Sequence, residues 1–406
     1  MPYGMTAAKR VVRYAASLLL AVLTPALLSA AETASDEAAL RETKLEDLGR
    51  ALFFDVNLSL GRNQSCATCH DPARAFVDWR DNGVGAAASM GDDLHSLGDR
   101  NAPTISYASQ IPPFGRDAVG EYIGGLFWDG RARDLEEQAA GPTLNALEMA
   151  MPDQATMRMR LLENANYGHA FRNLFGDDVL ETEESTYAAL MASIAAFERT
   201  AFFSPFDSKY DRYLRGEYEP NDEEALGMTL FFSNQFTNCN KCHQLNALPE
   251  TELETFTNYK YRNIGVPANH ALRQANGLGL DHVDLGLLEN PQVDDPAQAG
   301  RFRVPTLRNV AITGPYMHNG VFKDLRTVVL FYNKYLTRSS KAQINPETGE
   351  EWGAPEVPEN LALEELESGR ALDTRSVDAL IAFMRMLTDK RYEPLLEFDN
   401  AQGERD

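Results

Sequence analysis

The sequence is poor in basic residues, in cysteine, in strand signals and in long apolar runs. Its 38 lysines and arginines face 60 aspartates and glutamates, which gives the 406-residue chain a net charge of −22. So acidic a protein repels nucleic acid and anionic lipid and favours a neutral or basic protein partner, although plain solubility is the commoner meaning of an acidic surface. Nothing after residue 31 resembles a stop-transfer segment, so we expect no stable membrane insertion of the mature chain.

The one clear apolar run lies at the N-terminus. Three basic residues at positions 9–13 precede an apolar run at 14–28, and small residues follow at 29–31. The run is short for a membrane span, and this order is typical of a secretory signal peptide, which we assign to residues 1–31. An uncleaved signal anchor is the alternative. Cleavage removes three positive charges and no acid, so the mature chain carries −25.

All four cysteines belong to two copies of the motif Cys-x-x-Cys-His. In c-type haem sites the two thiols bond to the haem vinyl groups, and the next histidine ligates the iron. Two Cys-x-x-Cys pairs also suit zinc, but zinc does not require the histidines, and disulfides would leave them unexplained. Covalent haem is assembled outside the cytoplasm, which agrees with an exported, periplasmic protein. We therefore predict two haem c groups, attached through Cys66, Cys69, Cys239 and Cys242, with His70 and His243 as iron ligands.

The chain consists of two halves with the same order of features. Each has an aromatic lead-in, a haem motif and a closing helix, which apolar residues at three- and four-residue spacing predict at 187–199 and 377–387. An acidic linker at 217–224 leads into the second lead-in helix. Strand signals are few, so we predict an all-α protein with long loops and two cytochrome c-like domains, residues 32–204 and 205–406, each wrapping one haem.

A third pattern lies between the two motifs. It comprises Phe127-Trp128-Asp129-Gly130-Arg131, Leu135-Glu136-Glu137-Gln138, Gly141-Pro142 and Leu147-Glu148-Met149. With these runs and the two haem motifs, the sequence resembles the bacterial di-haem cytochrome c peroxidase family, and within it the MauG-like branch, over nearly the whole mature chain. The resemblance implies a haem-dependent peroxidase-type oxidoreductase that cleaves H2O2.

The resemblance gives roles to four residues of this pattern. It implies that Trp128 stands between the haems and passes electrons, and that Gln138 and Glu148 line the open face of the first haem, with Pro142 packed over the iron. A carboxylate in a partly dry pocket can carry a proton from one peroxide oxygen to the other, whereas an amide can only hold the bound oxygen. The alternatives are a core aromatic at Trp128 and a surface carboxylate at Glu148.

The upper ligand of the second haem must come from residues 313–320 or from a predicted helix at 325–335. Peroxidases of the family place a methionine on that helix and MauG places a tyrosine, and the matching position here is Tyr332. A phenolate stabilises oxidised iron, so this haem could share a highly oxidised state. Met317 is the rival ligand, and a packed core tyrosine remains the alternative.

The resemblance also implies a calcium ion between the haems. Its ligands would be the side chain of Asn101, the carbonyls of Thr313 and Pro315, and water. Hard oxygen ligands suit Ca2+, and its charge would help to fix the loop carrying Trp128, but on residues alone Asn-Ala-Pro is simply a turn. His95 lies in the loop that caps the first haem in many family peroxidases, but not at the usual distance, so we expect a five-coordinate first haem and a solvent-facing His95.

The predicted reaction is H2O2 cleavage at the first haem, with the oxidising equivalents shared by the second haem and used on a protein substrate, as in MauG-like maturation of a tryptophan-derived quinone. One departure weakens that substrate assignment, because MauG has a surface Trp where this chain has Thr237. Phe236 or a tyrosine would then be the exit, or the substrate differs. The alternatives are a cytochrome c peroxidase fed by a small cytochrome or cupredoxin, and a six-coordinate di-haem electron carrier. The loop at 339–360 has no assigned chemistry.

Overall fold

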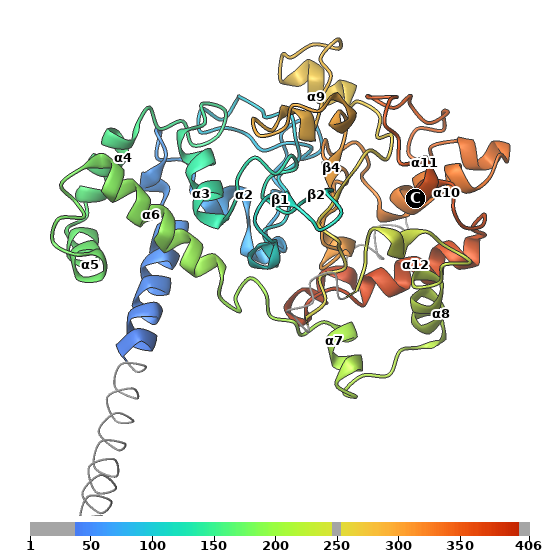
Figure 1. Cartoon of the computed structure of the whole chain (residues 1–406), viewed down its shortest axis with the longest axis horizontal. Helices are drawn as coiled ribbons and strands as arrows, with labels where there is room; N and C mark the ends of the chain where they lie inside the picture. The colour runs from blue at the N-terminus through green and yellow to red at the C-terminus, as the bar shows by residue number, and fades with distance from the viewer. Residues whose placement is uncertain (1–36, 246–252, 398–406) are drawn as a thin grey trace, which may run out of the picture.

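The computed structural model describes residues 37–245 and 253–397 (Figure 1). The predicted signal peptide lies outside the described residues. Within them, none of the helices combines the length and the apolar character that crossing a bilayer requires. After a helical segment at 37–53, the first half contains α2 (Cys66–Cys69), α3 (Leu135–Leu144), α4 (Gln154–Leu162), α5 (Ala165–Phe175) and α6 (Glu183–Glu198).

The second half is also mainly helical. Strands are confined, in the described part of the chain, to two antiparallel pairs of two-residue strands. Figure 1 shows these pairs between α3–α6 at one end of the molecule and α8, α10 and α12 at the other. The elements are α7 (Lys209–Leu214), α8 (Asp222–Phe231), α9 (His270–Ala275), α10 (Leu325–Leu336), α11 (Leu363–Leu366) and α12 (Thr374–Arg385), with β1 (Gly115–Arg116), β2 (Tyr122–Ile123), β3 (Tyr261–Arg262) and β4 (Phe302–Arg303).

Both closing helices form, as α6 and α12. Each begins earlier than predicted, because Thr182 and Asp373 cap the free N–H groups of their first turns. The linker prediction is wrong at its end: the acidic residues 222–224 form the first turn of α8. Asn221 closes a capping box with Glu224 there, and negative charge is favourable at a helix N-terminus.

A glycine at the same place in each half supports the internal repeat. Gly49 and Gly227 each lie three residues before a Leu-Phe-Phe run, on the two lead-in helices. A methyl group on Gly49 would lie 1.8 Å from the carbonyl oxygen of Ser193 on α6, and one on Gly227 would lie 1.8 Å from that of Ala379 on α12. The lead-in and closing helices therefore cross in backbone contact in both halves, which only glycine permits.

Each half has its own hydrophobic core. One cluster of buried side chains runs from Leu48 to Phe203 and the other from Tyr210 to Leu387. The predicted boundary at 204/205 falls between them in sequence. Charged and polar groups tie the halves together, since Tyr107 of the first half hydrogen-bonds Asp389 of the second.

Candidate functional site

The first haem motif is shaped to present one histidine nitrogen. Cys66–Cys69 form the single turn α2, whose end is closed by the His70 N–H donating to the Cys66 carbonyl at 2.9 Å. The His70 Nδ1 lies 3.1 Å from the carbonyl oxygen of Phe76, which can only accept, so Nδ1 carries the proton and Nε2 keeps the lone pair that ligation needs. Burial lowers the pKa of His70 and keeps the imidazole neutral, as ligation requires.

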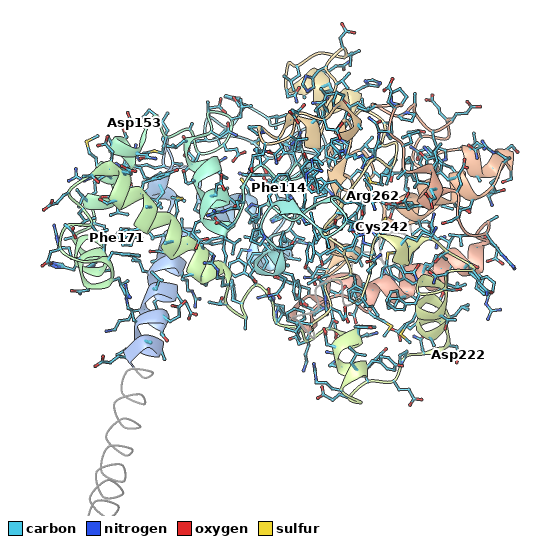
Figure 2. All side chains as sticks on the ribbon, viewed as in Figure 1. Phe114, Asp153, Phe171, Asp222, Cys242 and Arg262 are labelled. Carbon is cyan, nitrogen blue, oxygen red and sulfur yellow. The ribbon has the colours of Figure 1, made fainter. Side chains whose placement is uncertain are left out.

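The second motif repeats this geometry. The His243 N–H donates to the Cys239 carbonyl at 2.9 Å, and Nδ1 lies 2.9 Å from the carbonyl oxygen of Phe256. Burial lowers the pKa of His243 to about 4. Figure 2 places Cys242 beside Arg262, whose charge partly offsets the burial that raises the pKa of this thiol to about 11.

The structure argues against zinc and against disulfides. All four cysteines are free. No group of three His, Cys, Asp or Glu side chains within residues 37–245 and 253–397 could hold a metal ion, so the two Cys-x-x-Cys pairs do not converge on one zinc site.

A cavity of about 200 Å³ opens beside the second motif. Its wall is mostly apolar and contains Cys239, Cys242 and His243. Tyr332 reaches it from α10, and Met317 reaches it from the loop before that helix. The structure therefore brings both predicted upper-ligand candidates to the same space.

Buried polar atoms of this cavity fit a haem with its propionates. Arg303 lines the wall, is only 7% exposed, and its Nε has no hydrogen-bond partner among the described residues. A buried cation needs a negative partner, which a propionate would supply. His318 also lines the wall, with its ring stacked on Phe302 at 3.6 Å and its Nε2 3.8 Å from the Glu356 carboxylate. Neither Arg303 nor His318 was among the individually predicted site residues.

A second cavity, of about 100 Å³, contains the three predicted calcium ligands, Asn101, Thr313 and Pro315. Trp128 lines both this cavity and the larger one, so its ring lies between them. The indole Nε1–H of Trp128 donates to the Asn101 carbonyl at 2.8 Å. The position of Trp128 is thus coupled directly to the residue that would hold the ion.

The predicted peroxide-handling residues come from α3 and the turn after it. Gln138 and Pro142 are one turn apart on one face of α3. Glu148 lies beyond the helix end, where its Oε1 accepts a hydrogen bond of 2.9 Å from the Asn145 side chain. Burial raises the pKa of Glu148, with Arg131 opposing the shift. The Glu148 charge acts on the Cys69 thiol, which places this carboxylate near the first motif.

Two further positions bear on the predictions. His95 is exposed in its loop, where its backbone N–H donates to the Asp93 carboxylate at 2.9 Å. Thr237 is only 2% exposed, and its hydroxyl donates to the Leu230 carbonyl at 2.7 Å. Thr237 lines the larger cavity and does not form part of the outer surface.

Residues 43–219 match the model of the di-haem cytochrome c peroxidase family. The chain is 54% identical to the methylamine utilization protein MauG of Paracoccus denitrificans, over 95% of this chain and 99% of that protein. The chain belongs to the di-haem cytochrome c peroxidase family. It is 30% identical to the cytochrome c551 peroxidase of Nitrosomonas europaea, over 70% of this chain and 71% of that one. The solved diheme peroxidase BthA of Burkholderia thailandensis superposes with a TM-score of 0.75 at 31% identity, covering 86% of this chain and 87% of that one.

Membership of the family confirms several of the expectations. The protein is a di-haem oxidoreductase of the MauG type, a haem-dependent peroxidase-type enzyme with a mainly α fold. It therefore uses H2O2 together with a protein substrate or redox partner. An electron carrier without peroxidase activity is excluded.

Proposed function

We propose that this periplasmic enzyme uses H2O2 to oxidise a protein substrate, in the maturation of a tryptophan-derived quinone. The observation that carries the proposal is the 54% identity to a methylamine utilization protein MauG along 95% of the chain. The placement of Tyr332 on the cavity of the second motif supports it, because a phenolate ligand favours oxidised iron.

At the first site, haem bound through Cys66 and Cys69 and ligated by His70 supplies the redox chemistry of peroxide cleavage. Glu148 takes the proton from one peroxide oxygen and delivers it to the other, for which a half-buried carboxylate with a raised pKa is suited. The amide of Gln138 would orient the peroxide, and Pro142, one turn further along α3, would restrict the space around it.

At the second site, His243 and Tyr332 hold the iron of the haem attached to Cys239 and Cys242. Trp128 lines the cavity of the second motif and the neighbouring cavity of the proposed calcium ligands, and we assign to it the transfer of electrons between the two haem sites. The hydrogen bond from its indole to the Asn101 carbonyl fixes the ring in the orientation that this transfer requires.

The calcium ion is part of the proposal. Asn101, Thr313 and Pro315 share one cavity, where oxygen ligands suit Ca2+. Because Asn101 also holds the Trp128 indole, treatment with EGTA should slow electron sharing between the haems, and added Ca2+ should restore it. Stopped-flow spectra of the two haems measure this rate, with Mg2+ as the control ion. Full transfer rates in metal-free protein would remove calcium from the proposal.

A direct test mixes the holoenzyme and stoichiometric H2O2 with the quinone-free precursor of an enzyme that carries a tryptophan-derived quinone. The proposal expects the visible absorption of the quinone to appear in the precursor. The second candidate is a cytochrome c peroxidase, which the likeness to the cytochrome c551 peroxidase favours. Fast steady turnover with a reduced small cytochrome c, and no change in the precursor, would establish that candidate instead.

A further inference from the structure

The position at which MauG has a surface Trp as the exit for oxidising equivalents is Thr237 here, which cannot take that role. Thr237 is buried, and its side chain has no aromatic ring that could be oxidised. Its neighbour Phe236 is 41% exposed, but a phenyl ring is far harder to oxidise than an indole or a phenol. A route from the second haem site to a protein partner therefore needs another aromatic residue.

An aromatic cluster begins at Tyr332 and leads away from the cavity through α10. The ring of the buried Phe331 lies 6.0 Å from the Tyr332 ring and 5.5 Å from the ring of Trp352, centroid to centroid. Phe322 packs on both Phe331 and Trp352, at 5.1 and 5.6 Å. Phe331 thus fills the space between the proposed ligand of the second haem and a tryptophan, and an electron can tunnel between those two rings without oxidation of the phenyl ring.

Trp352 is firmly held and reaches the surface. Its indole Nε1–H donates to the Ala342 carbonyl at 2.9 Å, and its backbone N–H donates to the Gln343 carbonyl at 3.2 Å. The side chain is half-buried, whereas residues 346–351, directly before it, are all exposed. The loop at 339–360, which the sequence left without a role, therefore places an oxidisable ring at the edge of the molecule.

We propose that Trp352 is the relay through which the second haem site takes electrons from a protein partner, which docks over residues 344–352. The inference rests on the proposed function and names the residue through which oxidising equivalents leave the second haem site. Reduction of one H2O2 to two waters consumes two electrons and two protons. Trp352 gives one electron toward the second haem site across Phe331 and becomes a radical cation, whose proton stays on Nε1 in the hydrogen bond to the Ala342 carbonyl. One electron from the partner then reduces it again. Two such electron transfers complete the reduction of one H2O2 molecule.

The charge around Trp352 indicates the kind of partner. Residues 339–360 contain five glutamates and one lysine, and Glu347, Glu350 and Glu351 are exposed in the six residues that precede Trp352. An acidic rim on a chain of net charge −22 fits a partner with a basic patch.

Lys334 should tune the relay. Its Nζ lies 3.9 Å from the Phe331 ring centroid and 5.8 Å from that of Trp352. A positive charge there opposes the positive charge that an oxidised indole acquires. Removal of the ammonium group should therefore make Trp352 easier to oxidise. If the rings around Phe331 served only to stabilise the fold, this substitution would have no effect on the oxidation of Trp352.

The test compares Trp352→Phe with Trp79→Phe in the holoenzyme. Trp79 lies in the first half, is 55% exposed and donates a hydrogen bond from its indole to Asp71. Its replacement is therefore the control for loss of an exposed tryptophan. Each protein, grown with ring-deuterated tryptophan, receives stoichiometric H2O2 and is freeze-quenched for electron paramagnetic resonance. In wild type and in Trp79→Phe we expect the signal of a protein radical whose line width is reduced by the deuterium label. The radical signal should be lost in Trp352→Phe and should be stronger in Lys334→Met.

A kinetic arm uses a reduced, basic small cytochrome c as the electron donor. Trp352→Phe should slow its oxidation at least tenfold, while the peroxide-induced change of the haem spectrum stays at the wild-type rate. A radical and a donor rate unchanged in Trp352→Phe would overturn the relay and leave the proposed function standing. Absence of any peroxide-induced spectral change in wild type would instead reject the proposed function.

Discussion

Glu148→Gln is expected to slow peroxide cleavage about 100-fold or more, the usual range for loss of a general acid–base group. Glutamine keeps the size of the side chain and the hydrogen bond to Asn145, but it cannot carry a proton between the two oxygens. Stopped-flow mixing with H2O2 measures the second-order rate of the haem spectral change. Glu137→Gln, an exposed carboxylate on α3, is the matched control and should react at the wild-type rate.

The pH dependence adds a second criterion for Glu148. Burial raises its pKa above the ordinary value, and the ionised form must accept the first proton. The wild-type rate should therefore fall as the pH drops through this raised pKa, and the Gln variant should lose that dependence. A variant that cleaves peroxide at the wild-type rate with the same pH profile would show that Glu148 is not the proton carrier.

Tyr332→His is expected to leave both haems attached while it replaces the low-spin signal of the second haem and abolishes the sharing of oxidising equivalents. The reason is that imidazole is a neutral ligand and no longer stabilises oxidised iron as a phenolate does. Magnetic resonance and near-infrared spectra of the ferric and peroxide-treated protein measure both effects.

Two variants make the Tyr332 result specific. Tyr335→Phe removes a phenol from the same helix, where its hydroxyl donates to the Ile264 carbonyl at 3.0 Å, and should leave the low-spin signal unchanged. Met317→Leu removes the rival ligand, which lines the same cavity. A low-spin signal that changes in Met317→Leu and not in Tyr332→His would show that Met317 is the upper ligand of the second haem.

The features that the sequence could predict are those encoded by local patterns. Cys-x-x-Cys-His fixes a turn and aims one histidine, and apolar periodicity defines α6 and α12, so both could be read without knowledge of packing. The start of α8 was missed because an acidic run suits a solvated linker as well as a helix N-terminus.

The remaining features depend on contacts between distant segments. Arg303 is significant because folding buries it beside two cavities and leaves its Nε without a hydrogen-bond partner among the described residues, and an isolated arginine in a sequence gives no sign of that. Trp352 acquires a role only when its loop packs on Phe331. The signal that could have singled out Arg303 is its place in an otherwise apolar run, Phe302-Arg303-Val304-Pro305.

The central claim is that both halves carry thioether-bound haem and that one iron remains open to an oxidant. The most direct test combines the intact mass of the exported protein with its ferric absorption and magnetic spectra before and after one equivalent of H2O2. We expect the mass of two added haems, one high-spin and one low-spin ferric signal, and loss of both signals on addition of peroxide. A mass with fewer than two haems, or two low-spin irons that do not react with peroxide, would contradict the claim.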